Sequence, residues 1–136
     1  MPVIDAHRIV GAMPKPLRLL LVEDSERDAA LLKLHLRRGG YDASVERVDT
    51  TAALDAQLRA APWDVVVSDF NLPGFDAFAA RRIVQESGRG IPFIVLSGDF
   101  SPSAIEEMAA AGIRYVGKYE LGKLVPIIDD CMRERA

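Results

Sequence analysis

Short apolar runs alternate with longer amphipathic segments along most of this chain. The most uniform run is Val65-Val66-Val67, and consecutive β-branched residues are typical of a strand that is buried on both faces of a parallel sheet. The pattern predicts strands over residues 17–22, 42–48, 65–68, 91–97 and 113–117. It predicts helices over residues 25–39, 50–61, 76–87 and 101–112, and a last helix from Pro126 onward.

Turn and capping residues support these boundaries. Ser25 and Ser101 stand at the start of predicted helices, where a hydroxyl caps the first turn, and Gly39 and Gly40 end the first predicted helix. The segment Asn71 to Gly74 reads Asn-Leu-Pro-Gly, which is typical of a turn directly after the third strand. Pro126 suits the first position of the last helix.

Strictly alternating strands and helices predict parallel βαβ units with right-handed crossovers. Such units place helices on both faces of one sheet, so the predicted fold class is α/β, a three-layer α/β/α sandwich. Ligands of these folds bind at the carboxyl ends of the strands. The polar residues at those ends are Glu23, Asp24, Asp69, Ser97 and Lys118.

Composition narrows the class of protein further. A chain of 136 residues that is 49% hydrophobic and 27% charged has the length of one domain with one core. Its net charge of −3 provides no basic surface for nucleic acid, so direct binding to DNA or RNA is not expected. Cys131 is the single cysteine, which rules out an internal disulfide and favours a reducing, cytoplasmic location.

Residues 1–16 differ from the rest of the sequence. The segment carries Asp5 and His7 within its apolar part, and its hydrophobic stretch is too short for a signal peptide or a membrane span. Pro14 and Pro16 separate it from the first predicted strand. We therefore expect a flexible leader over residues 1–16, a folded domain over residues 17–136, and no attachment to a membrane.

The polar residues at the strand ends indicate a cation and a phosphoryl group. Three neighbouring carboxylates, from Glu23, Asp24 and Asp69, would repel one another unless a cation lay among them. Oxygen ligands without histidine or cysteine favour Mg²⁺. Asp69 could then attack a phosphoryl group, while Lys118 and Ser97 stabilise the charge that develops on its oxygens.

Two enzyme classes that handle phosphate fit less well. The segment GKYELGKL at residues 117–124 matches a P-loop until Leu124, where the hydroxyl that binds Mg²⁺ is missing. Phosphatases that resemble haloacid dehalogenases also use an aspartyl nucleophile after a strand. They need a second aspartate two residues later, where this chain has Asn71.

Four motifs together resemble the receiver domain of two-component response regulators. They are VED at 22–24, SDFNLPGF at 68–75, VLSG at 95–98 and YVGK at 115–118, and the resemblance extends over about residues 17–135. It implies a flavodoxin-like sheet of five parallel strands in the order 2-1-3-4-5. It also implies that Asp69 accepts a phosphoryl group from a sensor histidine kinase or a histidine phosphotransfer protein.

The same resemblance implies roles for the surrounding residues. Mg²⁺ would be held by Asp24 and Asp69, by Glu23 through water, and by the backbone carbonyl of Asn71. Lys118 would contact the phosphoryl group as part of the reaction.

Two further pairs of residues receive roles from the resemblance. Ser97 and Tyr115 match the pair that switches conformation after phosphorylation. Asn71 and Asp99 match the positions that modulate the attack of water on the acyl phosphate. Since an amide and a carboxylate both orient water, we expect the phosphate to be lost within minutes or less.

One position departs from the family pattern. Most receivers have a proline in a cis peptide after the lysine, but Lys118 precedes Tyr119, so we expect a trans bond here. Tyr119, Leu121 and Leu124 would then form an exposed apolar patch. That patch would lie on the face made by the fourth helix, the fifth strand and the last helix, where a homodimer or a downstream protein would bind.

A second function from another class stays open at this point. The alternative is a receiver-like fold that serves only as a docking or dimerisation module and works without phosphorylation. The presence of Glu23, Asp24, Asp69, Ser97 and Lys118 argues against it, because docking alone needs none of these side chains.

Overall fold

A computed structural model describes residues 13–98 and 101–135 of the chain. The helices and strands follow one another in the order β1 (Lys15–Val22), α2 (Glu26–Arg38), β2 (Tyr41–Val48), α3 (Thr51–Ala60), β3 (Val65–Asp69), β4 (Asn71–Leu72), β5 (Phe75–Asp76), α4 (Ala77–Glu86), β6 (Phe93–Ser97), α5 (Pro102–Ala110), β7 (Arg114–Gly117), the 3₁₀ turn η1 (Leu121–Lys123) and α6 (Leu124–Arg135). Among the described helices, none combines the length and the apolar character that a membrane crossing requires.

Five parallel strands form the central sheet in the order β2-β1-β3-β6-β7. Because β6 and β7 are the fourth and fifth of the predicted strands, this order confirms the expected 2-1-3-4-5 arrangement. The short strands β4 and β5 pair with each other in an antiparallel hairpin directly after β3. Pro73 and Gly74 connect them, and the φ of 86° at Gly74 is a conformation that glycine adopts without strain.

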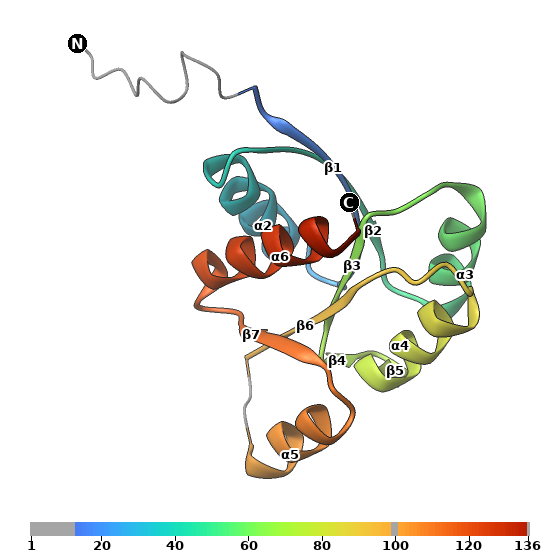
Figure 1. The fold of residues 1–136 in the computed structure, drawn as a ribbon. Coiled ribbons are helices and arrows are strands. Elements are labelled where there is room, and N and C mark those ends of the chain that lie inside the picture. Colours follow the sequence, from blue (N-terminus) through green and yellow to red (C-terminus); the bar gives the residue numbers. More distant parts are fainter. Residues whose placement is uncertain (1–12, 99–100, 136) are drawn as a thin grey trace.

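Successive side chains of a strand point to opposite faces of the sheet, and this divides the core into layers. Leu19 and Leu21 of β1 pack in one apolar cluster with side chains of α2 and α6, whereas Leu20 and Val22 pack in another with side chains of α3 and α4. Figure 1 shows α2 and α6 together on one side of the sheet, with α3 and α4 on the other. A third cluster joins β6 to α5 through Val95 and Met108. The fold is the predicted three-layer sandwich.

Side-chain caps fix where the helices begin. Ser25 Oγ accepts a hydrogen bond from the backbone N–H of Asp28 at 3.1 Å, and Ser101 Oγ accepts one from Ala104 at 3.3 Å. Both predicted caps are therefore confirmed. Asp76 caps α4 in the same way, so the hairpin that follows β3 leads directly into a helix.

The first strand is longer than predicted, since it begins at Lys15 and not at Leu17. Lys15 N–H donates to the carbonyl of Gly40 at 2.9 Å, and Lys15 lies opposite Tyr41 in the register with β2. Pairing with the start of β2 therefore extends the strand through Pro16, which the sequence pattern had marked as a boundary.

The last helix also begins earlier than predicted. It starts at Leu124, after the 3₁₀ turn, so Pro126 is its third residue and not its first. A proline is tolerated there because the first four N–H groups of a helix lack intrahelical partners. The bond between Lys118 and Tyr119 is trans, as expected.

The predicted apolar patch after Lys118 is wrong for two of its three residues. Tyr119 is 92% exposed, but Leu121 and Leu124 are only 8% and 0% exposed. The 3₁₀ turn directs both leucines into the cluster that contains Leu32 of α2 and Ile128 of α6. Burial of leucine removes apolar surface from water, so these residues contribute to the core and not to a docking surface.

Candidate functional site

The site lies at the carboxyl ends of β1, β3 and β7. Glu23 follows β1, and its N–H continues the ladder to β2 by donating to the carbonyl of Val48 at 2.9 Å. Asp69 is the last residue of β3. Lys118 follows β7, and its N–H donates to the carbonyl of Ser97 at 3.0 Å. Backbone pairing in the sheet therefore sets the starting point of each side chain.

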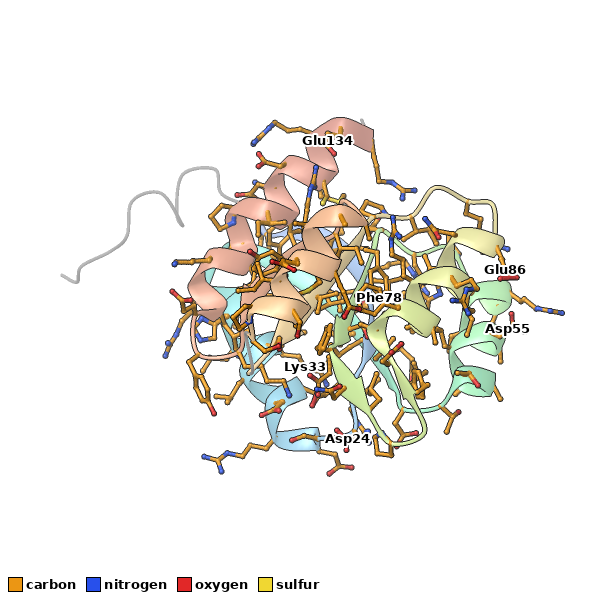
Figure 2. The ribbon with its side chains drawn as sticks, turned by 90° about the horizontal axis from the view of Figure 1, so that it is seen from below. Asp24, Lys33, Asp55, Phe78, Glu86 and Glu134 are labelled. Carbon is orange, nitrogen blue, oxygen red and sulfur yellow. The ribbon has the colours of Figure 1, made fainter. Side chains whose placement is uncertain are left out.

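Three carboxylates converge at this edge of the sheet. Glu23, Asp24 and Asp69 each offer one oxygen, and these oxygens all lie within 4.8 Å of one another. Glu23 is buried, with 2% of its surface exposed, while Asp24 is exposed. Figure 2 shows Asp24 beside the start of α2. The three predicted acidic ligands are thus brought together.

Within the described part of the chain, one ammonium group contacts the acidic cluster. Lys118 Nζ donates to Asp28 Oδ2 at 2.9 Å, to Asp69 Oδ2 at 3.0 Å, and to both oxygens of Glu23 at 3.3 Å. Burial lowers the pKa of Lys118, but hydrogen bonds to Asp28 and Asp69 outweigh burial and leave that pKa above its ordinary value. Lys118 therefore carries its charge at neutral pH.

The carboxyl groups around Lys118 outnumber its one ammonium group. Burial raises the pKa of Glu23, the carboxylate of Asp69 raises it further and Lys118 lowers it, which leaves this pKa at about 7 in place of 4.5. A carboxyl group with a pKa raised in this way is stabilised by another cation nearby. The donors at the cluster are all carboxylate oxygens, which suit a hard ion such as Mg²⁺. The residues present therefore fit the expected metal.

Among the described carboxylates that form ion pairs with Lys118, Asp28 is the one that the sequence pattern did not single out. It is the third residue of α2, where its N–H donates to the Ser25 cap. Its hydrogen bond to Lys118 lowers the pKa of the Asp28 carboxyl group. The signal that could have revealed it is spacing, because Asp28 lies three residues after a capping serine and four after Asp24.

Ser97 and Tyr115 lie on neighbouring strands of the sheet. Ser97 pairs with Gly117 and is buried, and Tyr115, two residues before Gly117, pairs with Val95. Side chains on one strand share a face at every second residue, so Tyr115 and Ser97 are directed toward the same face. The tyrosine is 37% exposed, at the side of the sheet where α5 packs.

Of the two positions predicted to control dephosphorylation, the structure describes one, Asn71. Asn71 is exposed at the start of β4, opposite Asp76 in the hairpin. It directly follows Phe70, whose N–H donates to the carbonyl of Leu96 at 2.9 Å. Asp99 lies outside the described residues.

A carboxylate beside an ammonium, together with converging carboxylate oxygens, lies at the parallel strand ends of an α/β fold, and this arrangement is consistent with a phosphorylation site. The family model for the response regulator receiver domain matches residues 19–123. The chain belongs to this family and is a receiver domain of two-component signal transduction.

Known proteins that resemble the chain include regulators of different lengths. It is 44% identical over 78 residues to the transcriptional regulatory protein YxdJ of Bacillus subtilis (strain 168). This match covers 57% of the present chain and 33% of YxdJ. It is 29% identical over 100 residues to the two-component response regulator ORR41 of Oryza sativa subsp. japonica, covering 72% of this chain and 79% of that protein.

A solved receiver-domain structure has the same fold. The receiver domain of the sensor histidine kinase PA1611 from Pseudomonas aeruginosa PAO1 superposes with a TM-score of 0.70 at 25% identity, over 85% of this chain and 96% of that one. A magnesium ion is coordinated in the active-site cleft of that structure.

Proposed function

We propose that Asp69 accepts the phosphoryl group when this receiver reacts with a phosphohistidine donor. The observation that carries the proposal is the contact between Asp69 Oδ2 and Lys118 Nζ at 3.0 Å. A carboxylate oxygen of Asp69 attacks phosphorus and forms a P–O bond as the P–N bond of the donor breaks. The electron pair of that bond stays on the imidazole nitrogen, which takes up a proton. An acyl phosphate on Asp69 and a neutral histidine result.

Lys118 and Ser97 stabilise charge in this reaction. The ammonium of Lys118 lies beside the acceptor carboxylate, where it neutralises one phosphoryl oxygen as negative charge develops. The hydroxyl of Ser97 supplies a hydrogen bond to another oxygen.

The cation is Mg²⁺ in this proposal. Asp24 and Asp69 would hold it directly, Glu23 through water, and Asn71 through its backbone carbonyl. The converging oxygens of the acidic cluster support this choice, as does the magnesium-bound PA1611 receiver domain. When bound, the ion neutralises phosphoryl oxygens and orients them toward the acceptor.

The proposed output is a change at the face made by α5, β7 and α6. Ser97 would follow the phosphoryl group and Tyr115 would follow Ser97 inward, which shifts the balance between two states that exist beforehand. The 37% exposure of Tyr115 supports this proposal, because part of its ring surface is still in water and would be buried by an inward move. A second copy of the chain or a downstream protein would read this face, while a sensor histidine kinase or a phosphotransfer protein would supply phosphate in the cytoplasm.

The receiver would act as a switch that catalyses only its own phosphorylation and dephosphorylation. Asn71 and Asp99 would orient the water that attacks the acyl phosphate, so the signal would decay without a separate enzyme.

The proposal is tested by intact-mass spectrometry after incubation with acetyl phosphate. The wild type should gain one phosphate with Mg²⁺ and none with a chelator, while Asp69→Asn should gain none under either condition. Full labelling of Asp69→Asn would show that another group is the acceptor. A wild type that never gains phosphate would instead favour the docking module that works without phosphorylation.

A further inference from the structure

Lys118 contacts three carboxylates, and one of them lies outside the metal and acceptor cluster. The cluster of oxygens within 4.8 Å of one another consists of Glu23, Asp24 and Asp69, whereas Asp28 contacts Lys118 from the first turn of α2. We propose that Asp28 is a positioning residue that holds the ammonium of Lys118 over the acceptor throughout the reaction. This inference rests on the proposed function, in which Lys118 stabilises the transferred phosphoryl group.

Asp28 is itself held in place. Its backbone N–H donates to Ser25 Oγ at 3.1 Å, and the following residue, Ala29, is buried and donates to the carbonyl of Ser25 at 3.1 Å. The helix therefore fixes the backbone from which the carboxylate reaches Lys118. A lysine side chain has four flexible bonds, so a fixed partner reduces the number of positions that its ammonium visits.

The other two partners of Lys118 have additional tasks in the reaction. Asp69 uses one oxygen for the new bond to phosphorus and would hold the cation directly, and Glu23 would hold the cation through water. Asp28 has neither task, so its Oδ2 stays available to the ammonium. It is the partner that Lys118 keeps when the charges of the other two are redistributed.

The contact with Asp28 does not draw Lys118 away from Asp69 in this structure. Nζ lies 2.9 Å from Asp28 and 3.0 Å from Asp69 at the same time, so both hydrogen bonds form in one position of the lysine. The aliphatic stem of Lys118 lines a small cavity with Leu32 and Leu121, and the side chain is 23% exposed. Packing therefore holds the stem, while the carboxylate partners set the position of the ammonium at its end.

The test compares phosphorylation rates of full-length variants with acetyl phosphate and Mg²⁺. Asp28→Asn should lower the rate roughly threefold to tenfold, the range expected for the loss of one partly exposed charged contact. Asp28→Glu should recover much of the rate, because it keeps the negative charge. Mg²⁺ affinity, measured from amide NMR shifts, should change less than about twofold, since Asp28 is not a ligand.

Glu26→Gln is the matched control. It removes the same charge from the first turn of the same helix, but Glu26 contacts Arg47 and not Lys118. Its rate should equal that of the wild type. If both substitutions slow the reaction equally, the effect comes from the general field of the helix terminus, and the proposal is overturned.

A double substitution shows whether Asp28 acts through Lys118. In a Lys118→Ala background, which should react slowly over long incubations, Asp28→Asn should have no further effect. An equal loss in both backgrounds, or an unchanged or faster rate for Asp28→Asn alone, would overturn the positioning role. These results are distinct from failure of the proposed function, in which the wild type itself gains no phosphate.

Discussion

The ammonium of Lys118 lies 3.0 Å from a carboxylate oxygen of Asp69, although 49 positions separate the two residues along the chain. Parallel strands bring them together, because β3 ends at Asp69 and β7 ends one residue before Lys118. The neighbouring strand β6 links the two ends through the bond from Lys118 N–H to the Ser97 carbonyl. A small shift at any one of these strand ends would therefore change the distance between the ammonium of Lys118 and the carboxylate of Asp69.

Mg²⁺ should stabilise the folded protein through the acidic cluster. At about 100 times its Kd the ion should add about 2.7 kcal/mol to the free energy of unfolding, since it binds only the folded state. Asp24→Asn should remove most of this gain, while Asp42→Asn, an exposed residue on β2, should keep it. Thermal melts with and without Mg²⁺ measure the difference. Equal gains for both variants would argue against Asp24 as a ligand.

Ser97→Ala should weaken the response to phosphorylation more than it affects folding. The hydroxyl lies buried at the end of β6, on the strand next to Tyr115. Beryllofluoride, which mimics the phosphoryl group, should shift the Tyr115 ring signals in NMR spectra of the wild type but much less in Ser97→Ala.

Ser68→Ala is the control for this experiment. Ser68 is an equally buried serine one residue before the proposed acceptor, and its hydroxyl donates to the carbonyl of Asp69 at 2.8 Å. It should preserve the Tyr115 response. A full response in Ser97→Ala would contradict the proposed switch pair.

Replacing Asn71 with leucine should lengthen the lifetime of the acyl phosphate. Asn71 is exposed at the start of β4, two residues after the proposed acceptor, and an apolar side chain there would not orient water. Decay is followed by intact mass after the donor is removed. Combining this change with Asp99→Leu should slow decay further, and an unchanged half-life in both variants would exclude these positions as modulators.

Leu124→Ala should destabilise the fold, whereas Tyr119→Ala should not. Truncating a leucine that is 0% exposed costs about 2–5 kcal/mol, while a change at a residue that is 92% exposed usually costs less than about 0.5 kcal/mol. Urea denaturation of both variants measures this. Similar stabilities would mean that Leu124 is not part of the core.

Hydrophobic pattern was sufficient to locate most of the fold. Strands such as β3 are uniform apolar runs that end on a polar residue, so the ends of the strands, and with them Asp69 and Lys118, could be identified from the sequence. The order of the strands could not be read from the pattern and came from the resemblance to receivers. The early start of β1 at Lys15 depends on pairing with Tyr41, a tertiary contact.

Two features of the site region needed three-dimensional information. Leu121 and Leu124 follow a strand end and a charged loop, so their sequence context is that of a surface segment. Only the 3₁₀ turn, which packs them against α2 and α6, explains their burial. Asp28 resembles any acidic residue in the first turn of a helix, and its role depends on a lysine 90 positions later.

The location of the phosphoryl group tests the central claim most directly. Borohydride reduces an aspartyl phosphate to homoserine, and peptide mass spectrometry then identifies the position that was modified. After reaction with acetyl phosphate and Mg²⁺, homoserine should be found at position 69 and should be absent when the donor or Mg²⁺ is omitted. Homoserine at position 24, 28, 64 or 76 in place of 69 would contradict the assignment of Asp69 as the acceptor.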